Sequence, residues 1–415
     1  MRKSMALLFF FFISVSFGVC QNNSDENISS FSSAVTLASQ GKYVEARDLF
    51  SYAAKGRYWY LDSQIYYEVC NNIINKKVQT SVGEYIFRGV YGYCNGVDFS
   101  EVMFYLNRAY GINPRYPYSY IIKGMFHLKR EEYKKALFEF DQACRLPTNN
   151  LYAFYYRGET YTLLGRAAEA IADYNRALKI DNHFLPAHIK RFEMYYKQND
   201  YERAFEDIKA IGPIDLGKVI NFEYSAMVND IGISFMQKGD LSRALDAFNL
   251  STSLDPRWPE PLLNRGIIFR QNKKYDQSLS EINKAIELDP DLDKSYFQRA
   301  LTYQQLGKLD TAEKDLLKVL FLDDKNVNAH YRLGTIYYKQ GRLDKAIHYF
   351  KKTIELDDKN VWAYYWIGFS YDKKKDYRKA YEAYNKFLDR VPASNFKHKI
   401  SVEKRVQLLT KYMNR

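Results

Sequence analysis

Small and apolar residues recur every 34 positions along most of the chain. In residues 327–360 the eighth position is Gly334, the eleventh is Tyr337, the twentieth is Ala346 and the twenty-fourth is Phe350. The next 34 residues repeat the pattern with Gly368, Tyr371, Ala380 and Tyr384. Self-similarity at a fixed period of this length indicates a stack of equivalent supersecondary units.

The same spacing continues towards the N-terminus. Units in this phase begin at Val361, Val327, Asp293, Pro259 and Ser225, and, after a slip of six residues, at Leu185, Leu151, Pro117 and Gly83. The slip lies within residues 211–225, where Gly212 and Pro213 must interrupt a helix. It is either a longer loop without a role or a bend between two blocks. A tenth, isolated unit is expected near Asn27, and residues 61–77 predict one further helix.

Each unit has the residue types expected of two antiparallel helices. Small residues at positions eight and twenty let the helices approach closely, and aromatic or aliphatic residues at positions four, seven, eleven and twenty-four fill the space around that contact. Position fifteen is a turn glycine in several units, namely Gly165, Gly239, Gly307 and Gly341. Proline near position thirty-two ends the second helix. The sequence therefore predicts an all-α protein in which neighbouring units bury each other's faces.

This pattern resembles the tetratricopeptide repeat, and the resemblance covers residues 83–394. It implies a right-handed superhelical solenoid of helix-turn-helix repeats. After the last repeat, Val402, Val406, Leu409 and Met413 form one apolar stripe on a basic helix. We expect a C-terminal capping helix here, with contact to anionic lipid heads as the alternative. The expected division is residues 1–20, 21–82 (a degenerate repeat region), 83–224 and 225–394 (two repeat blocks), and 395–415 (the cap).

The resemblance also implies a concave groove lined by the first helix of each unit, with positions two, five, nine and twelve facing inward. Aromatic residues are frequent in this row. The candidate partner-binding residues are Tyr155, Phe297, Tyr331, Trp362, Tyr365, Trp366 and Phe369. The Lys, Asn and Arg clamp with which some members of the family hold a terminal carboxylate is missing at these positions, which argues against a chaperone-tail adaptor. The alternative is that the row packs within the superhelix itself.

The N-terminus has the parts of a secretory signal. Arg2 and Lys3 precede an apolar run over residues 5–19, and a polar stretch follows. Residues 17–20 resemble a bacterial lipobox, which makes Cys20 a candidate lipid attachment site. Phe17 and Val19 depart from that motif, which prefers Leu and a small residue there. Lipidation, ordinary cleavage and an uncleaved anchor all remain open.

Composition and charge argue against other classes of function. The net charge of +12 comes from basic residues interleaved with acidic ones, without an Arg-rich arm, so we expect no nucleic-acid partner. The six histidines lack metal-ligand spacing, and phosphate-binding, GxSxG and HExxH motifs are missing. We therefore expect neither an enzyme nor a cofactor or metal. Cys70 and Cys94 could pair in an oxidising compartment, although buried free thiols are favoured.

The sequence thus predicts a non-enzymatic protein–protein interaction scaffold of the cell envelope, exported to a bacterial periplasm or anchored to its membrane. Its partners are expected to be proteins or peptide segments, with membrane association possible through the N-terminus. One alternative is a lipoprotein that assists outer-membrane or pilus secretin assembly. Another is a secreted array that binds surface polymers or host proteins.

Overall fold

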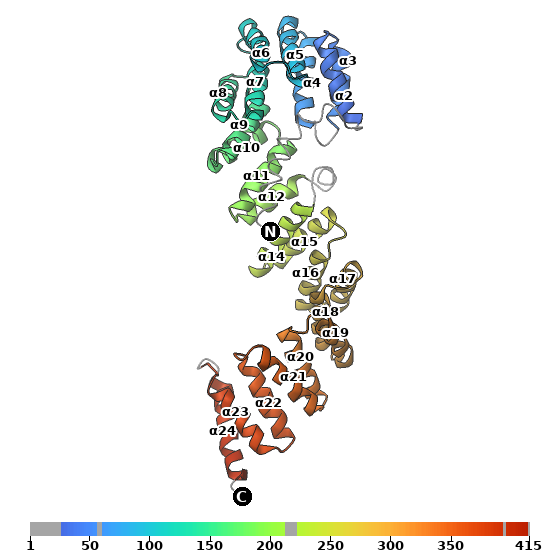
Figure 1. Ribbon diagram of the computed structural model, residues 1–415, viewed down its shortest axis with the longest axis vertical. Helices are drawn as coiled ribbons and strands as arrows, with labels where there is room; N and C mark the ends of the chain where they lie inside the picture. Colours follow the sequence, from blue (N-terminus) through green and yellow to red (C-terminus); the bar gives the residue numbers. More distant parts are fainter. Residues whose placement is uncertain (1–25, 56–59, 212–221, 393–395, 414–415) are drawn as a thin grey trace. The chain divides into compact units, whose positions relative to one another are not determined.

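A computed structural model describes residues 26–55, 60–211, 222–392 and 396–413, and it shows 22 α-helices in this part of the chain (Figure 1). The chain divides into two compact units, with the boundary between Ile220 and Asn221. We call them unit 1 and unit 2 and describe each by itself.

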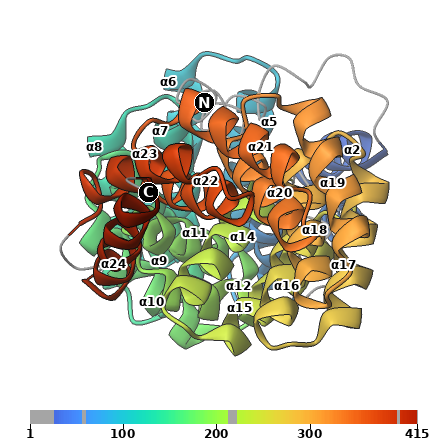
Figure 2. The ribbon, with the colours of Figure 1, turned by 90° about the horizontal axis from the view of Figure 1, so that it is seen from below.

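The helices of unit 1 are α2 (Glu26–Ser39), α3 (Tyr43–Ala53), α4 (Tyr60–Ile74), α5 (Thr80–Cys94), α6 (Phe99–Ile112), α7 (Pro117–Lys129), α8 (Tyr133–Arg145), α9 (Leu151–Leu163), α10 (Ala167–Ile180), α11 (Leu185–Lys197) and α12 (Tyr201–Ile211). Those of unit 2 are α14 (Phe222–Gln237), α15 (Leu241–Leu254), α16 (Glu260–Gln271), α17 (Tyr275–Leu288), α18 (Asp293–Gln305), α19 (Leu309–Leu322), α20 (Val327–Lys339), α21 (Leu343–Leu356), α22 (Val361–Lys373), α23 (Tyr377–Leu388) and α24 (Phe396–Met413). In unit 2 the pairs follow one another from α14–α15 to α22–α23 (Figure 2).

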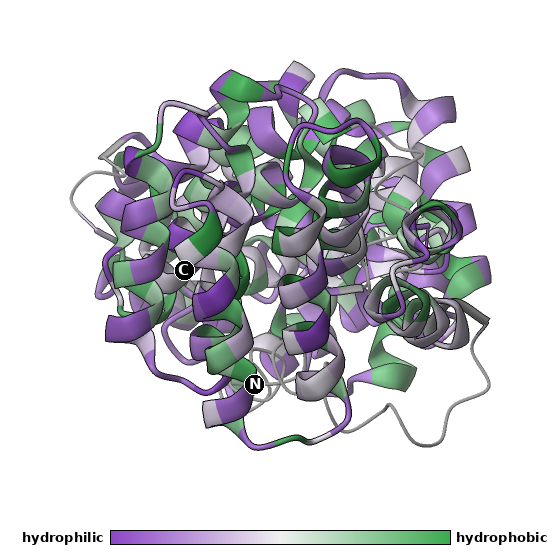
Figure 3. Cartoon of the chain, turned by 90° about the horizontal axis from the view of Figure 1, so that it is seen from above, coloured by the Kyte–Doolittle hydropathy of each residue, from purple (hydrophilic) through white to green (hydrophobic). Residues whose placement is uncertain are grey.

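The described helices confirm the predicted all-α solenoid of consecutive helix pairs. Nine predicted units correspond to the pairs from α5–α6 to α11–α12 and from α14–α15 to α22–α23, and the isolated unit is α2–α3. Hydrophobic and hydrophilic residues are mixed along the helices (Figure 3), as expected of helices with one buried and one exposed face. The six-residue slip and Gly212–Pro213 fall almost wholly outside the described residues, as does the segment 1–25.

The turn inside most pairs uses a left-handed residue at position fifteen. The predicted turn glycines have this conformation, with φ of +72° at Gly165 and +77° at Gly341. The same position is Lys273 in one unit and Lys375 in another, with φ of 60° and 62°. The backbone requires the conformation, and glycine adopts it at the lowest cost.

The expectation of an aromatic or aliphatic residue at position seven is wrong for several units. In four units it is an arginine whose guanidinium reaches the carboxylate at position twenty-three of its own unit and residue twenty-five of the preceding unit. For example, Arg299 donates to both carboxylate oxygens of Asp315, at 2.8 and 2.7 Å, and to Oδ1 of Asn283, at 2.8 Å. The other three are Arg157, Arg191 and Arg265. Because the arginine is ion-paired and hydrogen-bonded, it can replace a buried leucine there.

Helix α24 covers the end of the last helix pair of unit 2, as predicted. It packs on α23, and the apolar stripe buries Val402 and Leu409 against Tyr384 and Phe387. Arg405 adds a bidentate ion pair to Asp372 of α22, with distances of 2.7 and 2.6 Å. An exposed apolar helix face at the end of the array is thereby removed from water.

Candidate functional site

Three first helices of unit 2 carry six of the predicted groove residues, which we call the aromatic row. Phe297 lies on α18 and Tyr331 on α20, at the same position of successive units. Helix α22 adds the other four, Trp362, Tyr365, Trp366 and Phe369. All six side chains are half-buried, so each packs on the solenoid and still offers part of its surface to solvent.

Ring contacts join the α20 and α22 parts of the row. The indole Nε1 of Trp366 donates to the Tyr331 hydroxyl at 3.0 Å, and its ring stacks on Phe350 with an interplanar angle of 8°. Tyr365 lies 4.7 Å from Phe369 and 5.6 Å from Trp366, centroid to centroid. These contacts restrict the side chains to one arrangement before any partner arrives.

The far end of the row meets the cap. Trp362 and Tyr365 both pack on Phe387 of α23, and the His398 ring of α24 lies 5.0 Å from Trp362 and 6.0 Å from Tyr365. Burial raises the pKa of Tyr365, and it also raises that of Tyr331, where the hydrogen bond from Trp366 partly offsets it. These phenols are therefore neutral near pH 7 and can make apolar contacts and hydrogen bonds.

Tyr155, the remaining predicted groove residue, lies in unit 1 and is only 4% exposed. Its ring packs edge-on against Phe184 at 5.4 Å and lies 6.0 Å from Tyr174. It therefore forms part of the unit 1 core and presents almost no surface to a partner.

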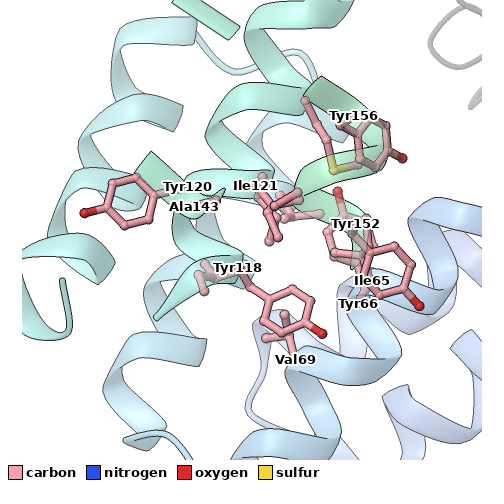
Figure 4. Packing of buried hydrophobic residues seen from close by; sticks show 14 of the residues in the cluster. Ile65, Tyr66, Val69, Tyr118, Tyr120, Ile121, Ala143, Tyr152 and Tyr156 are labelled. Carbon is pink, nitrogen blue, oxygen red and sulfur yellow. The ribbon is translucent and has the colours of Figure 1, made fainter. Parts of the chain in front are cut away.

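Helix α4 packs on α3 and also contacts the first helices α7 and α9 of two unit 1 repeats. Its residues Ile65, Tyr66 and Val69 lie beside Tyr118 and Ile121 of α7 and beside Tyr152 and Tyr156 of α9 (Figure 4). Polar contacts hold the same face, since Asp62 accepts from Lys129 Nζ at 2.8 Å and from the Tyr156 hydroxyl at 3.3 Å. Tyr152 also donates to Gln64 at 3.2 Å.

The residues that α4 covers stand at positions two, five, six and thirteen of their units, which are positions of the predicted groove and its border. The face of unit 1 that corresponds to the aromatic row is therefore occupied by the chain's own helix. Residues 61–77 predict this helix but not its location. The only signal was the absence of a second helix to pair with it.

The described cysteines, Cys70, Cys94 and Cys144, are free thiols, so the possible Cys70–Cys94 bond does not form in the structure. Burial raises the pKa of Cys70 and of Cys144 to about 12, which makes both thiols unreactive near neutral pH. Cys20, the candidate lipid attachment site, lies outside the described residues.

Metal-binding clusters and membrane-spanning helices are both missing from the described part of the chain. There, His, Cys, Asp and Glu side chains do not gather in groups of three or more that could hold a metal ion. Among the same residues, the helices are too short or too polar to cross a membrane.

The helix pairs define an α-solenoid of two-helix repeats, and sequence comparison identifies the repeat. Segments of the chain match family models described as "Tetratricopeptide repeat" at residues 26–55, 151–184, 259–292, 281–314, 327–360 and 362–394, and one described as "TPR repeat" at residues 303–341. Three of these matches begin at Leu151, Pro259 and Val327, the first residues of predicted units. The chain is a tetratricopeptide repeat protein.

Its similarity to individual proteins is confined to segments. "Anaphase-promoting complex subunit 3" of Schizosaccharomyces pombe is 30% identical over 111 residues, which are 26% of this chain and 16% of that protein. A "Tetratricopeptide repeat and J domain-containing co-chaperone" of Fusarium oxysporum is 34% identical over 85 residues, 20% of this chain and 16% of that protein. The chain thus matches about a sixth of the length of these curated relatives. A crystal structure of the MamA protein is 26% identical, covers 40% of this chain and 92% of its own, and has a TM-score of 0.37.

Proposed function

We propose that the protein is an exported interaction scaffold that holds a segment of a partner protein on the aromatic row of unit 2. The observation that carries the proposal is the row itself, six half-buried aromatic side chains on three successive first helices. Tetratricopeptide repeats supply shape rather than catalytic groups, so the partner is recognised by the side chains that the repeats present.

The row has the properties of a binding hot spot. Tyr and Trp provide large contact areas and lose little rotamer entropy on binding, and they dominate the energetics of many protein interfaces. In this row the hydrogen bond between Trp366 and Tyr331 and the packing of Tyr365 on Phe369 already fix the rings. Binding therefore orders few additional side chains, which lowers its entropic cost.

The proposal is confined to unit 2 because α4 covers the matching face of unit 1. An incoming segment would have to displace α4 together with the Asp62–Lys129 ion pair. On unit 2 the cap helix α24 meets one end of the row, where His398 contacts Trp362 and Tyr365, and both rings remain half-exposed.

Export and a location in the cell envelope are part of the proposal and rest on the N-terminal sequence. Arg2, Lys3 and the apolar run over residues 5–19 support a secretory signal, and Cys20 supports anchoring through a lipid. An array held at the membrane could assist the assembly of outer-membrane or secretin complexes, whereas a released array could bind surface polymers or host proteins. Fatty-acid labelling that is lost in Cys20→Ser favours the anchored form, and release of the unlabelled chain into the medium favours the secreted form.

The groove is tested with the double variant Tyr331→Ala, Tyr365→Ala. Truncated hot-spot aromatics typically cost about 2 kcal/mol or more each, so we expect at least a tenfold loss of partner capture by crosslinking in intact cells. A matched control, Leu317→Ala with Phe321→Ala, removes apolar surface from α19, where Phe321 is 80% exposed. Unchanged capture by the folded double variant, or an equal loss in the control, contradicts the proposal.

A further inference from the structure

Two arginines beside the aromatic row have no acidic partner. Arg270 stands in the last turn of α16 and is half-buried, and Arg332 is exposed on α20. The Arg270 Nη2 donates to the Gln298 side-chain oxygen at 2.9 Å, while its buried Nε finds no acceptor. Within the described residues, neither guanidinium forms an ion pair.

The neighbouring half-buried arginines do have acidic partners. Arg265, five residues earlier on α16, is paired with Glu281, and Arg299 on α18 is paired with Asp315. Burial lowers the pKa of Arg270, and the positive charge of Arg332 lowers it further. Arg270 nevertheless stays charged in water, so its charge is left uncompensated in a half-buried place.

The donor geometry fits one kind of ligand. The Nη1 and Nη2 end of a guanidinium can bind a carboxylate through two parallel hydrogen bonds. On Arg270 the Nε–H is buried out of reach of a partner, whereas Nη1 and the second hydrogen of Nη2 remain available besides the bond to Gln298. The positive charge of Arg332 acts on Arg270, lowering its pKa, and adds to the positive field that attracts an anion there.

The arginines also lie next to the proposed binding surface. Tyr331 and Phe297 of the row stand at position five of their units. Arg332 and Gln298 follow them directly and stand at position six. In the next unit position six is Trp366, a member of the row. A partner segment whose anionic group binds the arginines could therefore place its neighbouring apolar side chains on the aromatic rings.

We propose that Arg270 and Arg332, with Gln298 as a positioning residue, bind the carboxylate of an aspartate or glutamate side chain in the partner segment. Apolar residues beside that acidic residue lie on the aromatic row. This inference rests on the proposed function and adds the chemistry of the partner. The site differs from a clamp for a chain terminus, because it is made for a side-chain carboxylate within a segment.

The experiment selects a phage-displayed library of random peptides on the purified full chain. We expect selected peptides to combine Asp or Glu with nearby Trp, Phe or Leu. In fluorescence polarisation, changing the acidic residue of a selected synthetic peptide to its amide should weaken binding at least tenfold. Amidation of the peptide's C-terminus should leave binding unchanged.

Variants assign the effect to the two arginines. Arg270→Gln and Arg332→Gln should each reduce binding of the acidic peptide at least fivefold and leave binding of its amide version unchanged. Arg378→Gln, which removes the same charge from a side chain that is 86% exposed on α23, should have no effect. Thermal unfolding should show that Arg270→Gln is at least as stable as the parent chain, because it breaks no ion pair.

Several results overturn the proposal. It is wrong if the acidic and amide peptides bind equally, or if Arg378→Gln is as damaging as Arg270→Gln. It is also wrong if phosphoserine at the same place binds more tightly than glutamate, or if binding requires a free C-terminus. Selected peptides that bind the row without an acidic preference overturn only this inference. Failure to select any peptide that is sensitive to Tyr331→Ala, Tyr365→Ala overturns the proposed function itself.

Discussion

At position eight of most units, the two helices leave no room for a methyl group. A Cβ added to Gly334 would lie 2.6 Å from Cε1 of Phe350, at position twenty-four of the same unit. The corresponding distance is 2.5 Å between Gly368 and Tyr384. The unit that begins at Asp293 has Ala300 at position eight, and there position twenty-four is the smaller Leu316. The size of the residue at position twenty-four therefore limits the size of the residue at position eight.

We predict that Gly334→Ala destabilises unit 2 by about 1–3 kcal/mol, the usual cost of overpacking. Alanine favours helix by about 1 kcal/mol over glycine, so a net loss shows that the clash dominates. In urea denaturation, Gly334→Ala combined with Phe350→Leu should lose less than the sum of the single variants, because it copies the Ala300–Leu316 pair. Additive losses would mean that the two positions are independent.

At this scale, the sequence predicted what steric size determines. The small residues at positions eight and twenty and the turn glycines at position fifteen occupy the predicted places. Position seven was predicted wrongly, because an arginine read alone gives no sign that its carboxylate lies sixteen residues ahead. Arg270 and Arg332 could not be identified for the same reason, since what distinguishes them is the lack of a partner in space.

At the scale of the element, α4 shows how a helix outside the repeat pattern is used. It lies outside the nine repeat pairs but packs on α3, where Tyr66 lies 5.6 Å from Phe50, and its apolar residues also meet those of α7 and α9. Asp62 anchors it, since it receives both the Lys129 ammonium and the Tyr156 hydroxyl, and the side chains of Asp62 and Lys129 are each 15% exposed. A carboxylate in this position stabilises α4 only while both partners are present.

We predict that Asp62→Ala loosens α4 from the repeats and lowers the stability of unit 1 by about 2–4 kcal/mol, because the Lys129 charge is left without its partner. Hydrogen–deuterium exchange should speed up along α4 before it does so in α7 or α9. Asp48→Ala, which removes an exposed carboxylate paired with Arg47, should change stability by less than about 0.5 kcal/mol. Equal exchange rates in α4 of the parent and of Asp62→Ala would contradict the role given to Asp62.

The sequence predicted a helix at α4 and a cap at α24, and both elements form. It could place the cap because the last repeat has an apolar face with no following repeat to pack on it, and the next helix in the sequence is α24. It could not predict all the contacts of α4, because some of them join residues that are far apart in sequence, such as Asp62 and Lys129. Periodicity describes contacts between neighbouring units, whereas α4 meets α7 and α9 in addition to its neighbour α3.

Buried tyrosines give the whole molecule a common response to alkaline pH. Burial raises the pKa of Tyr43 and of Tyr93 in unit 1 to about 12, and it raises the pKa of Tyr384 in unit 2. In the unfolded chain, the phenol pKa is about 10. The phenol pKa is higher in the folded chain than in the unfolded chain, so folding favours the neutral phenol over the tyrosinate. This contribution to stability is complete below about pH 10 and is lost as the pH rises towards 12.

We predict that the helical circular dichroism stays constant to about pH 10 and then falls in a steep transition, and that tyrosinate absorbance rises in the same step. Tyr43→Phe should make the loss of stability with pH less steep, because that residue no longer ionises. Tyrosinate forming gradually around pH 10 with the helices intact would show that the phenols are accessible in the folded chain.

The arginines at position seven have a consequence for how the array can change its length. Each guanidinium is bonded to residue twenty-five of the unit before it, so the two bonded residues must be inherited together. Where the following unit has Leu333 instead of arginine, residue twenty-five is Leu317 rather than an asparagine or aspartate. Consider a duplication or deletion of 34 residues whose boundary falls between position twenty-five of one unit and position seven of the next. It separates the arginine from the residue that accepts its hydrogen bond. It is tolerated only where the new neighbours match. Recombination between units of this protein is therefore limited by whether residue twenty-five of one unit suits residue seven of the next.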